Sequence, residues 1–178
     1  MRVALCGSHR VGKSTLAEAV LEVLPGHALV PEPYESLVEE GYEFAEEPAL
    51  EDFEAQLERA IADVLSSGPD TVFDRCPLDL LGYLTTHPDA EAFELDDWMA
   101  RIEAAVAKLD LIVFVPIEEP DRVPVPRSEG RLRAKVDAAL QAIVVDDTYG
   151  LDFSVITVEG SLSARLHQVV AAVRDQGK

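Results

Sequence analysis

The residues with the clearest chemistry lie near the start of the chain, where two glycines enclose a short polar segment. This segment reads Gly7-Ser8-His9-Arg10-Val11-Gly12-Lys13-Ser14 and matches the pattern G-x-x-x-x-G-K-[ST] at every fixed position. The glycines let the backbone curl, so that successive N–H groups point toward an anion. The lysine adds a positive charge beside the outer phosphates, and the serine hydroxyl can ligate Mg²⁺. The segment therefore predicts a loop that binds the phosphates of ATP or GTP.

The flanking residues favour this interpretation over an ordinary glycine turn. The apolar run from Arg2 to Cys6 predicts a strand before the loop, and residues Lys13 to Leu24 predict a helix after it. The N-terminus of a helix attracts anions through unpaired N–H groups and a partial positive charge. The residues expected to contact the nucleotide are Gly7, Ser8, His9, Arg10, Val11, Gly12, Lys13, Ser14 and Thr15.

A carboxylate follows the second expected strand, which covers residues 27–30. Glu32 lies there between two prolines. Because the carboxyl ends of parallel strands form the ligand-binding edge of such sheets, Glu32 is expected beside the substrate. It could accept the proton of an attacking hydroxyl or hold that hydroxyl in line. The alternative is a surface glutamate in a chain that has 34 acidic residues.

An acid and a base follow the third expected strand, residues 71–73, at the same edge. Asp74 could support the Mg²⁺ that Ser14 ligates, and Arg75 could hold a substrate phosphate or hydroxyl with its planar guanidinium. The alternative for this pair is a local ion pair that closes the strand. Asp79, about one helical turn further on, could bind substrate in the same cleft or cap its own helix.

A proline-containing loop over residues 116–126 precedes a group of arginines. A lid around residues 118–135 would exclude water from the nucleotide when it closes. Arg127 and Arg131 are four residues apart and could share a helix face. Arginines from a lid can offset the charge that develops on a transferred phosphoryl group. Arg133 follows in the same segment and could be supplied by the lid in the same way. The alternative for each of these arginines is exposed charge on a helix.

The composition limits the class of protein. A net charge of −19 argues against sequence-independent binding to nucleic acid, which requires a broad basic face. No apolar run approaches the ~20 residues of a membrane helix, and the apolar start continues directly into the glycine loop rather than into a signal-peptide cleavage site. We therefore expect a cytoplasmic protein without membrane contact. Cys6 and Cys76 match neither a disulfide framework nor a zinc pattern, and burial is favoured over a redox role.

Strand and helix patterns alternate along the chain. Further helices are expected over residues 49–67, 77–84 and 129–145, from residue 96 or 97, and from residue 161; further strands are expected over residues 109–115 and 153–158. Alternation of this kind implies parallel strands joined by right-handed crossovers, hence a three-layer α/β/α sandwich. With 178 residues and no linker, residues 1–178 are expected to form a single domain.

Other sequence features distinguish between the classes of protein that carry such a loop. The chain contains no Asn-Lys-x-Asp tetrapeptide for guanine, and the strand at 109–115 ends in Val115-Pro116-Ile117 instead of the adjacent acids of a mechanical ATPase. The Glu-Pro after the second strand and the Asp-Arg after the third resemble the nucleoside/nucleotide kinase group. The layout Asp74-Arg75-x-Pro77-Leu78-Asp79-x-Leu81-x-Tyr83 is closer to the ribosylnicotinamide-kinase-like AAA domains of bacteria.

This resemblance implies a P-loop NTPase fold with a parallel five-stranded sheet in the order 2-3-1-4-5, ATP as phosphoryl donor, and Mg²⁺. Two features depart from the family pattern. Ser128-Glu129-Gly130 separates the lid arginines, and the segment from Tyr34 to Pro48 is unusually acidic. If it borders the acceptor pocket, its carboxylates would repel a phosphorylated acceptor and favour a neutral or cationic one. The alternative is a solvated acidic face.

We therefore expect a kinase that moves the γ-phosphoryl group of ATP to a hydroxyl of a nucleoside-like small molecule. The catalytic residues would be Lys13, Glu32, Asp74, Arg127 and Arg131; the substrate ligands Glu32, Arg75 and Asp79; and the metal ligands Ser14 and Asp74. The alternatives are a nucleotide sensor with little turnover and a polynucleotide end kinase, against which the acidic composition argues.

Overall fold

The fold is built around one sheet of parallel strands. The structure, a computed structural model, describes residues 1–121 and 126–176; of residues 127–129 it describes the backbone alone. Within these residues five strands are present: β1 (Arg2–Cys6), β2 (Ala28–Val30), β3 (Thr71–Asp74), β4 (Leu111–Phe114) and β5 (Val155–Thr157). Their order is β2-β3-β1-β4-β5, and every pair is parallel. The strand order implied by the family resemblance is thus confirmed.

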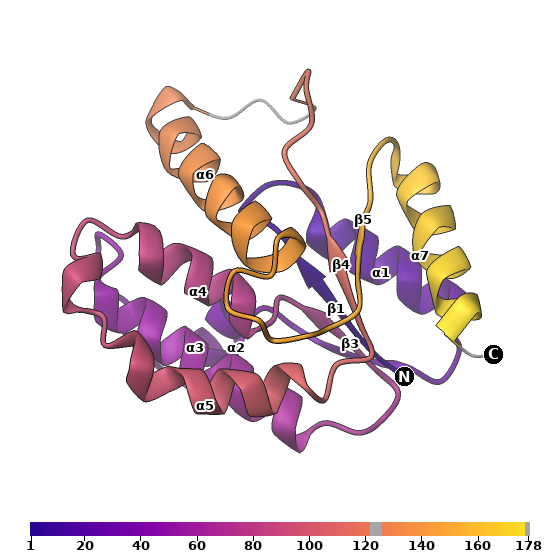
Figure 1. The fold of residues 1–178 in the computed structure, drawn as a ribbon, viewed down its shortest axis with the longest axis horizontal. Helices are drawn as coiled ribbons and strands as arrows, with labels where there is room; N and C mark the ends of the chain where they lie inside the picture. The colour runs from indigo at the N-terminus through magenta and orange to yellow at the C-terminus, as the bar shows by residue number, and fades with distance from the viewer. Residues whose placement is uncertain (122–125, 177–178) are drawn as a thin grey trace.

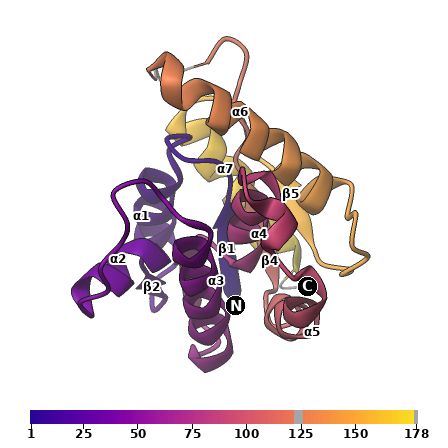
Figure 2. The ribbon, with the colours of Figure 1, turned by 90° about the vertical axis from the view of Figure 1, so that its left-hand side faces the viewer.

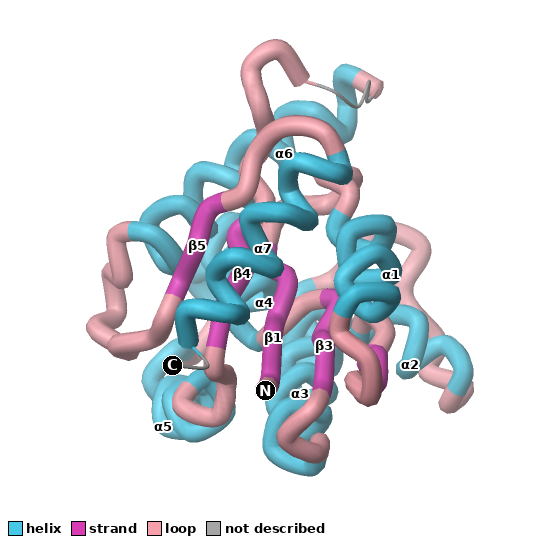
Figure 3. The backbone as a smooth tube through the Cα atoms, turned by 90° about the vertical axis from the view of Figure 1, so that its right-hand side faces the viewer, coloured by secondary structure: helices cyan, strands magenta, loops and turns pink. Residues whose placement is uncertain are grey.

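Helices cover both faces of the sheet (Figure 1). The helices are α1 (Lys13–Val23), α2 (Pro33–Glu39), α3 (Leu50–Ser66), α4 (Pro77–Thr86), α5 (Leu95–Val106), α6 (Arg127–Leu140) and α7 (Leu162–Gln176), with a 3₁₀ turn η1 (Ala90–Ala92) and a π-helical turn η2 (Gln141–Val145). Helices α1 and α7 lie on one face (Figure 3), and α3, α4, α5 and α6 on the other, where α6 runs above α4 (Figure 2). The expected three-layer α/β/α sandwich is confirmed.

Alternation along the strands explains the two layers. On β1, Val3 and Leu5 pack with α1 and α7, whereas Ala4 and Cys6 pack with α3 to α6. Strand β4 is buried throughout, as expected for an inner strand of a sheet with two covered faces. Each face therefore has its own apolar core.

The strand register brings the sites identified in the sequence to one edge. Leu5 of β1 is paired with Asp74 of β3, and Cys6 is paired with Phe114 of β4. The loop after β1, the pair Asp74–Arg75 and the residues after β2 therefore leave the sheet side by side, at its carboxyl edge.

Some elements differ from the sequence expectations. Helix α2 forms within the acidic segment that had no predicted structure; Pro33 suits its first turn, because a proline there gives up an N–H that would be unpaired in any case. Helix α6 begins at Arg127 rather than Glu129, and its last five expected residues form the π-helical turn η2. Residues 122–125 of the expected lid lie outside the described residues. None of the described helices is both long and apolar enough to cross a membrane.

A glycine sets the spacing between α4 and α6. A Cβ atom on Gly82 would lie 2.7 Å from Cδ2 and 2.9 Å from Cγ of Leu140. We expect Gly82→Ala to lower the free energy of unfolding by about 1–3 kcal/mol through overpacking, which outweighs the helix propensity of about 1 kcal/mol that alanine adds. Urea unfolding measures this change.

Gly68 provides the matched control, because a Cβ atom there meets nothing within 4 Å. Gly68→Ala should leave the stability within about 0.5 kcal/mol of the parent protein. Gly82→Ala should also cost less in a Leu140→Ala background, since the clash is then gone. Equal costs in both backgrounds would contradict this account of the helix packing.

Candidate active site

The carbonyl groups of the glycine-rich loop are held in place by donors around it. The ammonium group of Lys13 donates to the carbonyl oxygens of Gly7 and Ser8, both at 2.8 Å, and Leu16 N–H donates to Gly12 O at 3.1 Å. The remaining three carbonyls accept hydrogen bonds from two distant arginines.

These arginines come from helices far along the chain. Arg133 of α6 donates from Nε to His9 O at 3.0 Å and from Nη2 to Arg10 O at 3.3 Å. Arg165 of α7 donates from Nη1 to Val11 O at 2.7 Å. Both side chains are buried. Each carbonyl from residue 7 to residue 12 is therefore engaged, which favours a loop whose N–H groups face a bound anion.

Each of these buried arginines forms an ion pair with a carboxylate. Arg133 pairs with Asp121, and Arg165 pairs with Glu118 at 2.7 Å. Glu118 also accepts a hydrogen bond from the N–H of Gly160 at 2.7 Å. No motif near Arg165 in the sequence indicates its role. Arg133 lies among the arginines that follow the proline-containing loop, but a catalytic role was predicted only for Arg127 and Arg131.

The curl of the loop depends on backbone conformations that suit glycine. Gly12 has a φ of 90°, in the left-handed region, and Arg10 adopts the same region with a φ of 57°. A Cβ atom on Gly7 would lie 2.4 Å from Val115 O, so any side chain there would displace β4 or the loop. The two glycines of the pattern are thus required for different reasons: Gly12 for its backbone conformation and Gly7 for lack of space.

Lys13 is buried beneath the loop. Burial lowers the pKa of its ammonium group to about 8, and the charge of Arg75 acts in the same direction, while Asp79, Asp74 and Glu32 oppose the shift. Lys13 is also the first residue of α1, whose N-terminus has no side-chain cap. Positive charge and helix N-terminus are thus directed at one place.

Asp79 ties this loop to helix α4. One carboxylate oxygen accepts from Gly7 N–H at 2.9 Å, and the other accepts from Cys76 N–H at 3.0 Å, which caps the helix. The side chain is fully buried, and it does not line the cavity that lies beside the loop and is bordered by Glu32 and Arg75. This placement corresponds to the capping alternative of the sequence analysis.

Asp74 fits the metal that a phosphate loop uses. Burial raises the pKa of Asp74, and the nearby Ser14 hydroxyl and the charge of Lys13 oppose this shift. Its Oδ1 atom is buried and has no hydrogen-bond partner among the described residues. An unpaired carboxylate oxygen close to a serine hydroxyl matches the oxygen ligands that Mg²⁺ prefers.

Glu32 and Arg75 meet at this edge, as expected from their positions after β2 and β3. The Nε atom of Arg75 lies 2.7 Å from Glu32 Oε1, and its Nη1 atom lies 3.7 Å from Asp79. Burial by itself would lower the pKa of Arg75, but Tyr83, Glu32 and Asp79 raise it above its usual value. Arg75 also has a φ of 102°, a costly conformation for a non-glycine residue and one that concentrates at functional sites.

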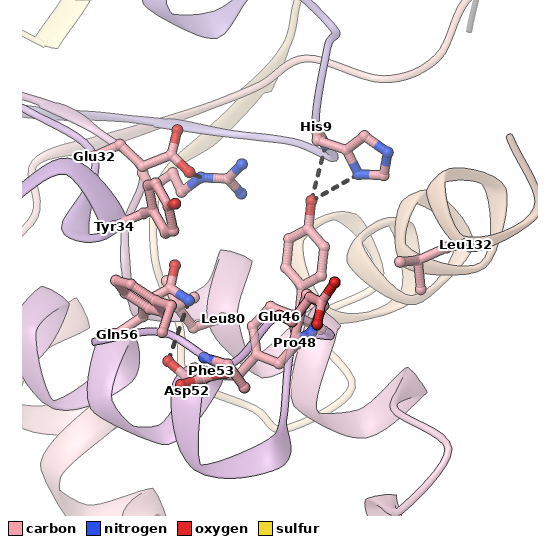
Figure 4. A pocket seen from close by; sticks show the side chains of 14 residues that line it. His9, Glu32, Tyr34, Glu46, Pro48, Asp52, Phe53, Gln56, Leu80 and Leu132 are labelled. Carbon is pink, nitrogen blue, oxygen red and sulfur yellow. Dashed lines mark hydrogen bonds and ion pairs between the residues drawn. The ribbon is translucent and has the colours of Figure 1, made fainter. Parts of the chain in front are cut away.

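A cavity of about 360 Å³ adjoins the loop (Figure 4). Glu32 and His9 lie on opposite sides of it, and Phe53 of α3 lies below them. Aromatic side chains form much of its wall: Tyr34 and Phe44 contact each other at 4.5 Å between ring centroids, and Phe53 stacks on Tyr83 at 5.2 Å. Tyr83 stood in the motif that carried the family resemblance, but its aromatic partners had no signal in the sequence.

Of the two predicted lid arginines, only Arg131 has a described side chain, and it forms no hydrogen bond or ion pair with the described residues of the loop. Arg131 is exposed on α6, and the side chain of Arg127 lies outside the described residues. Arg133, two residues after Arg131, reaches the loop instead. One helical turn after Arg133, Asp137 accepts hydrogen bonds from Ile117 N–H at 3.1 Å and from the Ser8 hydroxyl at 3.5 Å.

The sheet order, the glycine-rich loop after β1 and the buried lysine define a P-loop NTPase fold. The family model described as "AAA domain" matches residues 2–165, and the chain belongs to this family. No curated protein matches the sequence.

Solved structures match across nearly the whole chain. Deoxyadenosine kinase from M. mycoides with bound dATP is similar with a TM-score of 0.69 and 13% identity, over 98% of this chain and 99% of that one. The NadR protein in complex with NAD and AMP-PNP gives 0.68 and 17%, over 98% and 49% respectively. Thymidylate kinase from Candida albicans gives 0.64 and 14%, over 99% and 92%. At these identities the likeness establishes the fold.

The double contact of Asp79 can be tested through stability. Asp79→Asn places an NH₂ group against one of two buried N–H donors, so one of them loses its acceptor. We expect a loss of about 1–3 kcal/mol in the free energy of unfolding, measured in urea. The control, Asp89→Asn, changes an exposed carboxylate and should stay within about 0.5 kcal/mol of the parent. Equal stabilities of the two variants would show that Asp79 does not hold the loop.

Proposed function

We propose that residues 1–178 act as a single-domain, Mg²⁺-dependent kinase that moves the γ-phosphoryl group of ATP to a hydroxyl of a nucleoside-like small molecule. The observation that carries this proposal is the cavity that adjoins the P-loop, with Glu32 and Arg75 in its wall. A sensor or switch needs a nucleotide site alone, whereas a transferase needs a second site within reach of the terminal phosphate. The related fold of deoxyadenosine kinase and thymidylate kinase supports the same class of reaction.

At the nucleotide side, Lys13 and the loop N–H groups would hold the phosphates, apart from those of Gly7 and His9, which already donate to Asp79 and Tyr83. Ser14 and Asp74 would hold Mg²⁺, which when bound supplies positive charge that offsets the charge of the phosphates. Lys13 donates to the carbonyls of Gly7 and Ser8, and the third N–H of its ammonium group would contact a bound phosphate. Its lowered pKa follows from burial, and an anionic ligand would favour the charged form again.

At the acceptor side, Glu32 would orient the hydroxyl or accept its proton. Glu32 is about a quarter exposed, so it can reach a ligand in the cavity while it pairs with Arg75. That ion pair holds the carboxylate in one direction. A carboxylate of fixed orientation is what a general base or a positioning group requires.

The charge of the cavity favours an acceptor without a phosphate group. Glu46 and Asp52 line it together with Glu32, and Arg75, a cation in its wall, is already paired with Glu32 and near Asp79. Aromatic rings in the wall suit a flat ring system. We therefore favour a neutral or cationic nucleoside-like acceptor over a nucleoside monophosphate.

A panel assay tests this function directly. ATP consumption should increase with at least one nucleoside and not with the corresponding monophosphate. Tight nucleotide binding without any acceptor-stimulated turnover would indicate a sensor. Turnover that requires an oligonucleotide and falls steeply with salt would indicate a polynucleotide end kinase.

The role of Glu32 gives a second test. Glu32→Gln keeps the shape of the side chain but removes its charge, so phosphoryl transfer should slow by about 10²-fold or more while ATP affinity changes less than about threefold. Stopped-flow or coupled kinetics and calorimetry measure the two quantities. Glu39→Gln, an exposed change on α2, is the control. Unchanged transfer in Glu32→Gln would remove this residue from the mechanism.

The arginines of α6 should separate binding from catalysis. We assign Arg131, with Arg127, to stabilising the transferred phosphoryl group, so Arg131→Ala should lower kcat by about tenfold or more with little change in nucleotide affinity. Arg133→Ala removes the donors to two loop carbonyls and should weaken nucleotide binding by about tenfold. Losses of the same kind in both variants would contradict this division of roles; titration calorimetry and steady-state kinetics distinguish them.

A further inference from the structure

Tyr83 of α4 connects the P-loop to the cavity. His9 N–H donates a hydrogen bond to Tyr83 Oη at 3.0 Å, and Nδ1 of the same histidine lies 3.0 Å from that oxygen (Figure 4). Both residues line the cavity. One hydroxyl group therefore contacts the backbone and the side chain of a single loop residue.

His9 is not required by the phosphate-binding pattern, which leaves this position open. Its peptide groups are nevertheless held on both sides, the N–H by Tyr83 and the carbonyl by Arg133. The His9 N–H thus points toward α4, where the hydroxyl lies. Phosphate binding alone therefore does not explain the contacts that His9 makes with Tyr83 in the wall of the cavity.

The ring of Tyr83 contacts the acceptor side. It stacks on Phe53 with an angle of 10° between the ring planes, and the guanidinium carbon of Arg75 lies 5.3 Å from its centroid. Arg75 in turn holds Glu32 at 2.7 Å. Tyr83 therefore contacts the loop with its hydroxyl and Arg75 with its ring, and a hydrogen bond between Tyr83 and Arg75 adds to this contact.

We infer that Tyr83 is a positioning residue, which acts through His9 to hold the P-loop in register with the acceptor cavity. This inference rests on the proposed function. Transfer requires the attacking oxygen and the terminal phosphate to lie in line, and an error of about 1 Å can slow such a reaction about 10²-fold. A link between the two sites should therefore affect turnover more than the binding of either ligand.

The test uses Tyr83→Phe, which keeps the ring contacts and removes the hydroxyl. We expect kcat to fall by about 10- to 100-fold, with the Kd for ATP and the KM of the best nucleoside of the panel within about threefold of the parent values. Tyr149→Phe is the matched control, because Tyr149 is a half-buried tyrosine on the loop before β5, outside the cavity. Its kinetics should equal those of the parent protein.

The histidine is tested by replacement and rescue. His9→Ala should also lower kcat. His9→Asn should restore part of the lost kcat, because the asparagine amide can reach the Tyr83 hydroxyl. The double variant Tyr83→Phe/His9→Ala should be no slower than Tyr83→Phe, since Tyr83→Phe already removes the side-chain contact that His9→Ala breaks.

The outcomes separate this inference from the function on which it rests. A parent protein that transfers phosphate to no nucleoside overturns both. A parent that does so, with a Tyr83→Phe variant of equal kcat, overturns the inference alone. A loss that appears in the ATP Kd or the acceptor KM instead of kcat, or an additive double variant, also overturns it.

Discussion

The structure depends on the orientation of the peptide groups in one short loop. A loop that binds phosphate has to direct its N–H groups at the ligand, and its carbonyls then face the protein, where they need donors. Here Lys13, Arg133 and Arg165 supply five of the six donors, and a helix N–H supplies the other. Cations serve this purpose well, because they also oppose the negative charge that the ligand brings.

Because of this arrangement, many elements of the chain contact one short loop. Helices α4, α6 and α7 each contribute at least one side chain that bonds to the loop, and the loop itself joins β1 to α1. The chain has a net charge of −19, yet two arginines are buried at the loop. Arg133 and Arg165 are each paired with a carboxylate there. Burial of an arginine costs desolvation energy that an ion pair only partly offsets, so we interpret these pairs as orienting the arginines rather than as stabilising the fold.

The cavity beside the loop lies at the same edge of the sheet, and the charged residues that line it are mainly acidic. Glu32, Asp52 and Glu46 line the cavity, and Arg75 is held between Glu32 and Asp79. Through Asp79 and Tyr83, α4 contacts both the loop and the wall of the cavity. Helix α4 thus contacts both parts of the site, and it packs closely at Gly82 against α6, the helix that carries Arg133.

The sequence by itself determined the loop, the alternation of strands and helices, and the placement of Glu32, Asp74 and Arg75 at one edge. Each of these follows from a local pattern, because residues after parallel strands leave the sheet on the same side. Only the tertiary structure showed that Arg165 and Arg133 reach the loop, that Asp79 bonds Gly7, and that Tyr83 meets His9. These contacts join residues 72 to 154 positions apart, so they depend on how helices pack across the sheet, which local patterns do not encode.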